Sequence, residues 1–159
     1  MVITLGSRTA ETAKVYFEKA QNPQIRKALP QKAQTVDEAL EDFRKTQLPG
    51  ATSFGRTILA DSRYIGDIWC YCIDLEDEPN CMVSFCIFEP EYWSKGITTI
   101  ALQLFMKEII VKYGINTIGA FAYASNHASV KVLEKNNFAL MEEFEEDGVL
   151  SKYFQYTRK

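Results

Sequence analysis

Hydrophobic and polar positions recur along the chain with two different periods, which predicts a mixture of helices and strands. In residues 97–113, apolar side chains recur three and four positions apart, as on the buried face of a helix. Gly114 follows, and glycine commonly ends a helix because it accepts a left-handed backbone. Residues 81–88 are almost continuously apolar, which is typical of a strand buried on both faces. The pattern therefore predicts a strand, a short loop and then a helix.

The other elements follow from the same periodicities and from turn residues. Thr35 and Glu38 predict a capping box at the start of a helix. Glu108 and Lys112 are four apart and predict an ion pair along the central helix. The pattern predicts further helices at residues 9–20 and 128–136, a turn between Pro23 and Pro30, and strands at residues 2–5, 57–60, 64–73, 117–123, 140–145 and 150–157. This order predicts an α+β fold, with a mixed, mostly antiparallel sheet flanked by helices and a parallel central pair formed by residues 81–88 and 117–123.

Length and charge restrict the kind of protein. The chain has 159 residues, so we expect a single domain over residues 1–159 with a sizeable core. Its formal net charge of −3 argues against a nucleic-acid-binding face. No stretch approaches the roughly 18 apolar residues of a membrane span, and the N-terminus lacks the pattern of a signal peptide. We expect a cytoplasmic protein with neither nucleic acid nor membrane as partner.

The cysteines do not predict a metal site. Cys70, Cys72, Cys81 and Cys86 form no Cys-x-x-Cys pair, and the single histidine, His127, is far from them in sequence. All four lie in apolar, strand-like segments. We therefore expect no metal and four buried free thiols in a reducing compartment.

The loop between the apolar strand and the central helix is the first candidate for chemistry. A helix that starts after such a loop directs unpaired backbone N–H groups and the positive end of its dipole at one point, which favours a phosphate. Gly96 would let an anion approach without a Cβ in the way, and Lys95 adds a positive charge. A single glycine is equally compatible with an ordinary connection, so the residues alone leave both interpretations open.

Two segments resemble a known family. Tyr92-Trp93-Ser94-Lys95-Gly96-Ile97-Thr98 resembles the acyl-CoA loop of the GNAT superfamily of N-acetyltransferases, most closely the branch that acetylates ribosomal-protein N-termini. Residues 126–138 resemble that branch's pattern Asn-x-x-Ser-x-x-Val-Leu-Glu-Lys-x-Gly-Phe. The resemblance covers about residues 73–138. It implies acetyl-CoA as acyl donor, no metal, and a sheet whose two central strands splay apart to admit the pantetheine arm.

The resemblance also implies roles for particular residues. Cys86 and Phe88 would line the pantetheine arm through their backbones, and Asn126 would contact it. Ser129 would give a proton to the leaving thiolate. The residues implied to bind the rest of the cofactor are Trp93, Ser94, Lys95, Gly96, Ile97, Thr98 and Thr99. Asn126 is also a good helix cap, and Ser129 could simply be a residue of the first helical turn.

The sequence departs from the family at the proton-transfer positions. Leu133 stands where many members have an acidic tyrosine, and Met82 where a strand glutamate often serves as base. Glu89 and Glu91 are weaker candidates for the base, and a backbone N–H near Ile87 and Phe88 is the candidate oxyanion donor.

Two functions therefore stay open. One is an acetyltransferase acting by direct attack in a ternary complex on a primary amine, either a peptide or protein N-terminus or a small amine. The other is a non-catalytic acyl-CoA-binding regulatory domain. The acidic residues 142–147 suit a cationic acceptor, although a solvated charge run explains them as well. We expect a monomer or a homodimer.

Overall fold

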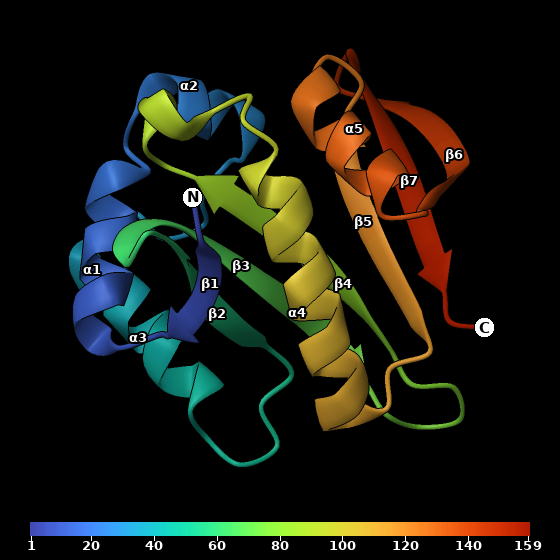
Figure 1. Cartoon of the computed structure of the whole chain (residues 1–159), viewed down its shortest axis with the longest axis horizontal. Coiled ribbons are helices and arrows are strands. Elements are labelled where there is room, and N and C mark those ends of the chain that lie inside the picture. Colours follow the sequence, from blue (N-terminus) through green and yellow to red (C-terminus); the bar gives the residue numbers. More distant parts are fainter.

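A computed structural model describes residues 1–159 and contains one seven-stranded sheet (Figure 1). The strand order is β1-β2-β3-β4-β5-β7-β6, and every neighbouring pair is antiparallel except β4 and β5. The elements are β1 (Ile3–Ser7), α1 (Ala10–Lys19), α2 (Pro23–Ala28), α3 (Val36–Thr46), β2 (Phe54–Ala60), β3 (Arg63–Asp74), β4 (Asn80–Ile87), a 3-10 turn (Pro90–Tyr92), α4 (Ile97–Tyr113), β5 (Thr117–Tyr123), α5 (His127–Lys135), β6 (Ala139–Glu146) and β7 (Val149–Thr157). The predicted α+β class is confirmed.

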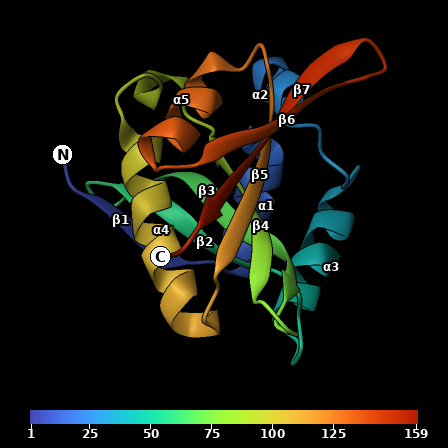
Figure 2. The same ribbon diagram turned by 90° about the vertical axis from the view of Figure 1, so that its right-hand side faces the viewer.

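Helices cover the sheet on both faces. Figure 2 shows α4 and α5 on one side of the sheet and α1, α2 and α3 on the other. The main core lies under α4, where its buried face meets the strands; its largest members include Phe105, Leu102, Ile109, Ile68, Val83 and Phe154. A smaller cluster on the opposite face joins Ala20 and Ile25 to Cys86 and Phe88. Because β4 contributes to both clusters, its near-continuous apolar pattern follows from burial on two faces.

The two central strands splay apart, as predicted. Only Asn80, Cys81 and Met82 of β4 pair with β5, opposite Thr117, Ile118 and Gly119. Beyond this point β4 continues beside β3 as far as Ile87, while β5 continues beside β7 as far as Tyr123. The gap therefore widens toward the carboxyl ends of both strands, as Figure 1 shows.

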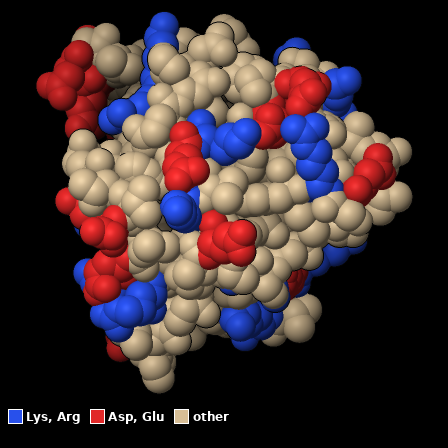
Figure 3. Space-filling model, turned by 90° about the vertical axis from the view of Figure 1, so that its left-hand side faces the viewer, with Lys and Arg blue, Asp and Glu red and all other residues tan.

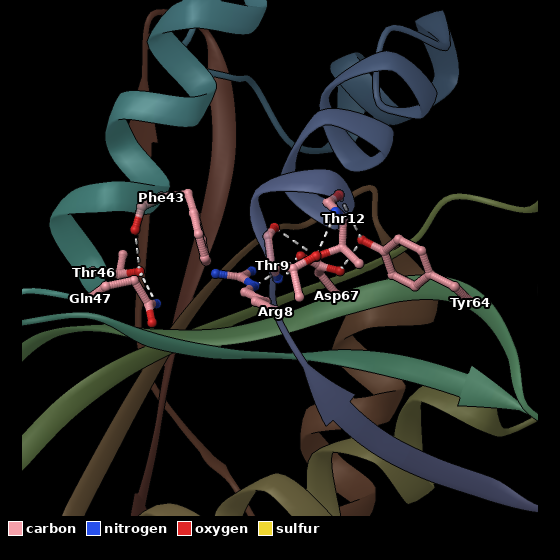
Figure 4. Close-up of polar contacts among 8 residues, drawn as sticks. All are labelled: Arg8, Thr9, Thr12, Phe43, Thr46, Gln47, Tyr64 and Asp67. Atoms are coloured by element: carbon pink, nitrogen blue, oxygen red, sulfur yellow. Dashed lines mark hydrogen bonds and ion pairs between the residues drawn. The ribbon is translucent and has the colours of Figure 1, made fainter.

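A buried polar network fixes the start of α1 to the sheet (Figure 4). Arg8 Nε donates to Asp67 Oδ2 at 2.9 Å, and the Tyr64 hydroxyl donates to the other carboxylate oxygen. Thr9 and Thr12 form a reciprocal capping box at the first turn of α1. Burial raises the pKa of Asp67, and the positive charge of Arg8 acts in the opposite direction. The network holds the start of α1 over β3.

Helix boundaries differ from the prediction in two places. The segment expected to be a turn between Pro23 and Pro30 is helix α2, since Asn22 caps it and Pro23 occupies its first turn. At α3, the Thr35 side chain accepts from the Glu38 N–H, but the Glu38 carboxylate accepts from Gln34 instead of completing the box with Thr35.

Two side-chain predictions are wrong. Glu108 does not pair with Lys112, because Arg56 reaches it from β2 and forms hydrogen bonds to both of its carboxylate oxygens. Lys112 instead lies 4.6 Å from the centroid of the Phe54 ring. Cys72 is exposed and has a φ of 53°, because the β3–β4 register shifts between Tyr71 and Asp74.

The surface carries charges of both signs. Figure 3 shows basic and acidic side chains interspersed over the left-hand face of the molecule as drawn in Figure 1. Several form ion pairs, including that of Arg63 with Glu91 at 3.0 Å. No helix of the protein has the length and apolar character needed to cross a membrane.

Candidate active site

A cleft of about 680 Å³ occupies the gap between β4 and β5. Its walls come from α2, the end of β4, the loop before α4, β5 and the first turns of α5. It brings together ten residues that sequence analysis had selected: Cys86, Trp93, Ser94, Lys95, Gly96, Ile97, Thr98, Thr99, Asn126 and Ser129. Phe88, the remaining selected residue, does not line the cleft and is buried in the smaller cluster beside Tyr16 and Tyr64.

The loop before α4 is shaped to leave backbone donors free. Ser94 and Gly96 both have positive φ, at 60° and 75°, and Gly96 is the residue that precedes the first turn of α4. No side chain caps this helix, so the first N–H groups of α4, starting at Ile97, have no partner from a capping residue. Together with the helix dipole, these groups have the donor arrangement that can hold an anion.

Trp93 closes the loop onto the strand. Its indole Nε1 donates a hydrogen bond to the backbone carbonyl of Ile87 at 2.8 Å. The indole therefore lies between the end of β4 and the start of α4, where it lines the cleft beside Tyr92. This contact gives Trp93 a structural role in addition to any contact with a ligand.

The pairing of β4 with β3 decides which backbone groups face the cleft. The N–H of Phe88 donates to the Ile65 carbonyl of β3 at 2.9 Å. In an antiparallel pair alternate residues turn both backbone groups toward the partner, and the register runs unbroken from Ile87 to Met82. Cys86 therefore also bonds toward β3, whereas Phe85 and Ile87 face the gap. The N–H of Phe88 is therefore occupied by β3, and the register leaves the backbones of Phe85 and Ile87, instead of those of Cys86 and Phe88, facing the gap.

Asn126 and Ser129 lie together at the start of α5. Asn126 Oδ1 accepts a hydrogen bond from the Ser129 N–H at 3.2 Å, so Asn126 is the cap of this helix. The Ser129 hydroxyl makes no hydrogen bond within the protein, and both residues line the cleft. Asn136, at the far end of α5, donates to the Thr99 carbonyl of α4 at 3.3 Å and holds the two helices together.

Two lysines of α5, Lys131 and Lys135, were missed by sequence reasoning. His127, Lys131 and Lys135 all line the cleft. They are spaced by four residues, which places them on one helical face, and this spacing could have been read from the sequence. With Lys95 they form a basic rim around the cleft, which suits a ligand with several phosphates.

The cleft offers few groups for acid–base chemistry. Leu133 is only 1% exposed and belongs to the core, and Met82 lies outside the cleft. Glu89 pairs with Lys19 at 2.9 Å and Glu91 pairs with Arg63, so neither predicted base candidate reaches it. Burial raises the pKa of Cys86 to about 12, so this thiol stays protonated at neutral pH. No group of three or more metal-binding side chains is present.

The architecture agrees with known transferases of acyl groups. The chain aligns over 99% of its length with aminoglycoside acetyltransferase AAC(6')-Ib in complex with coenzyme A, at a TM-score of 0.82, 15% identity and 95% coverage of that chain. It aligns equally well with RimL, a ribosomal L7/L12 alpha-N-protein acetyltransferase, also in complex with coenzyme A (TM-score 0.82, 15% identity, 99% and 94% coverage). A spermidine N-acetyltransferase from Vibrio cholerae, in complex with CoA and spermine, gives a TM-score of 0.85 at 15% identity, with 98% and 95% coverage.

Sequence comparison identifies the family. The model of the acetyltransferase (GNAT) domain matches residues 3–139. The chain therefore belongs to the GNAT acetyltransferase family. The search of curated protein sequences finds no match.

Proposed function

We propose that this protein transfers the acetyl group of acetyl-CoA to a primary amine by direct attack in a ternary complex. The observation that carries the proposal is the uncapped start of α4 at the mouth of the splayed gap, surrounded by the basic rim of Lys95, His127, Lys131 and Lys135. A pyrophosphate at the first N–H groups of α4 and an extended arm in the gap fit this combination. The CoA complexes of three structural neighbours support the same choice of donor.

The backbone of β4 provides the partners for the arm. Phe85 and Ile87 direct their backbone groups toward the gap, and the Ile87 carbonyl already accepts from Trp93. The Ile87 N–H is therefore the donor we assign to the thioester oxygen as it becomes an oxyanion. Asn126 can use its amide nitrogen toward the arm, since its oxygen is occupied by the Ser129 N–H.

The reaction needs no covalent intermediate. The nitrogen of a neutral amine attacks the thioester carbon, the carbon–sulfur bond breaks, and the CoA thiolate takes up a proton. We assign that proton to the Ser129 hydroxyl, which has no partner within the protein, lies in the cleft and recovers a proton from water after the transfer. No carboxylate lines the cleft, and we assign water as the acceptor of the proton that the amine loses.

A second candidate is a CoA-binding domain without catalysis. Leu133 in the core and Met82 outside the cleft favour it, because the positions that often hold an acid and a base in this family cannot transfer protons. Both candidate functions predict CoA binding, but only the first predicts turnover.

One pair of measurements separates them. Calorimetry with CoA and with acetyl-CoA measures binding, and release of free CoA in the presence of a panel of primary amines measures transfer. We expect binding of both ligands and amine-dependent CoA release above the rate of acetyl-CoA hydrolysis. Binding without release from any amine would establish the non-catalytic alternative, and absence of binding would refute both.

A further inference from the structure

An aromatic surface continues from the cleft onto the open face of the last three strands. Phe121 of β5 lines the cleft and is 56% exposed. Its ring centroid lies 5.1 Å from that of Tyr153 on β7 and 5.9 Å from that of Phe144 on β6. The three rings therefore cross three adjacent strands as one surface, which we call the aromatic strip.

The aromatic strip is not part of the core. Side chains opposite one another in a sheet share a face, and Phe121 is opposite Tyr153, which is opposite Glu142. Their neighbours Ala120, Ala122 and Phe154 point the other way and are buried in the core cluster with α4. Figure 2 shows that α4 and α5 cover only that side, and that the β6–β7 hairpin extends toward the side of α1–α3. The strip is left uncovered on the open side.

Acidic groups border the aromatic strip. Glu142 and Glu146 alternate with Phe144 along β6 and so lie on its face, and both are exposed and form no ion pair. Glu143 and Glu145 point to the other face, where Glu143 pairs with Lys152 at 3.7 Å. Aromatic rings beside free carboxylates attract a cation with an apolar stem, through both the ring face and the negative charge.

We propose that the acceptor is a polycationic primary amine: one amine enters the gap, and a second ammonium lies on the aromatic strip beside Glu142. This rests on the proposed function and names its substrate class. The gap borders β5, and β6 lies two strand spacings from β5, about 10 Å. We therefore expect a spacer of roughly that length between the two nitrogens. Both a linear polyamine and an aminoglycoside present this chemistry.

A matched pair of acceptors tests the second charge. An aliphatic diamine and an amino alcohol, both of eight carbons, have the same length and differ only in the distal group. We expect kcat/KM for the diamine to exceed that for the amino alcohol about fivefold, as one exposed ion pair and one cation–π contact allow. The ratio should fall with added salt. A ratio near one at low salt would overturn the inference.

Matched variants test whether the preference for the diamine arises at the aromatic strip. Glu142→Gln and Phe144→Leu should reduce the diamine preference to about twofold or less and leave the rate with the amino alcohol unchanged. Glu145→Gln removes the same charge from the opposite face and should leave the preference intact. An equal loss in Glu142→Gln and Glu145→Gln would show a general charge effect and refute the site.

Further acceptors show which kind of amine the protein prefers. Spermidine and kanamycin test the linear and the cyclic polycation, and a peptide with an uncharged body tests the N-terminus. A better kcat/KM for that peptide than for every polycation would overturn the inference while the proposed function stands. If calorimetry detects no CoA binding, or if CoA binds and no amine is acetylated, the proposed transfer fails and the inference fails with it.

Discussion

The indole Nε1 of Trp93 donates to the carbonyl of Ile87 across 2.8 Å, and this single bond joins the loop before α4 to the end of β4. It holds the two backbone segments that frame the mouth of the cleft. Trp93→Phe keeps an aromatic ring and removes the donor. We expect it to weaken CoA binding by about 1 kcal/mol, or roughly fivefold, as for the loss of one hydrogen bond. Calorimetry measures this change, and unchanged affinity in the folded variant would show that the loop is held by other contacts.

Two substitutions of Gly96 compare the effects of backbone strain and of negative charge on CoA binding. Its φ of 75° disfavours any side chain, yet beyond the adjacent residues no atom lies within 4 Å of the position that a Cβ would take. Gly96→Ala should therefore cost about 1 kcal/mol through strain, with a modest loss of CoA affinity. Gly96→Asp adds a negative charge at the proposed phosphate position and should abolish binding. Equal affinities of these two variants for CoA, measured by calorimetry, would argue against a phosphate at this loop.

Substitutions of Asn126 and Ser129 should affect different properties: CoA binding for Asn126 and turnover for Ser129. Ser129→Ala keeps the N–H that Asn126 caps, so stability and CoA affinity should remain near normal while kcat falls more than tenfold, at the low end of the range for loss of a proton donor. Asn126→Ala should weaken CoA binding and also destabilise the protein by about 1 kcal/mol through the lost cap. Steady-state kinetics and urea unfolding measure these effects. Normal turnover in Ser129→Ala would leave water as the proton donor.

Asp67 should make stability depend on pH in an unusual direction. Burial raises its pKa, so the folded protein binds this proton at a pH where the unfolded chain has released it. The stabilisation from the protonated carboxyl is complete below the unfolded pKa of about 3.9 and is lost as the pH rises through the folded pKa. Relative to Asp67→Asn, the wild type should become less stable as the pH rises from about 4 to 7. Urea unfolding across this range tests it, and a relative gain in stability would mean that Arg8 dominates over burial.

The cysteines differ in accessibility. Cys72 is exposed, whereas Cys70, Cys81 and Cys86 are at most 9% exposed. Iodoacetamide should therefore modify one thiol per native molecule, and none in Cys72→Ser. Mass spectrometry counts the modified groups. Rapid modification of two or more thiols in the native protein would indicate that the buried strands open locally.

The fold could be predicted because its signals are local. The apolar run in β4, the periodic face of α4 and the order of elements all appear in short windows of sequence. The family resemblance added the splay, which no local pattern shows. Helix α2 was missed because two prolines suggested a turn, although Pro23 is acceptable in the first turn of a helix.

The candidate site could be predicted where a sequence motif marks it. It could not be predicted where the strand register of the folded protein determines which groups face the cleft. The loop from Trp93 to Thr99 was found by its motif. The backbone groups of β4 that face the gap could not be predicted, since only the pairing of Phe88 with Ile65 sets which residues these are. The exposure of Cys72 depends on a register shift that the apolar pattern does not reveal. Lys131 and Lys135 could have been predicted from the sequence, because they follow His127 at intervals of four residues, the spacing of one helical face.

The short β4–β5 ladder also determines where the sheet should open first during local unfolding. Three residue pairs provide all the strand-to-strand bonding between β1–β4 and β5–β7–β6, so the main chain resists their separation far less than it resists separation within either half. Amide hydrogens at this seam should exchange with deuterium sooner than those in the centre of either half. An extended ligand arm bonded to both strands would act as a bridging strand, and it would slow exchange in both halves at once.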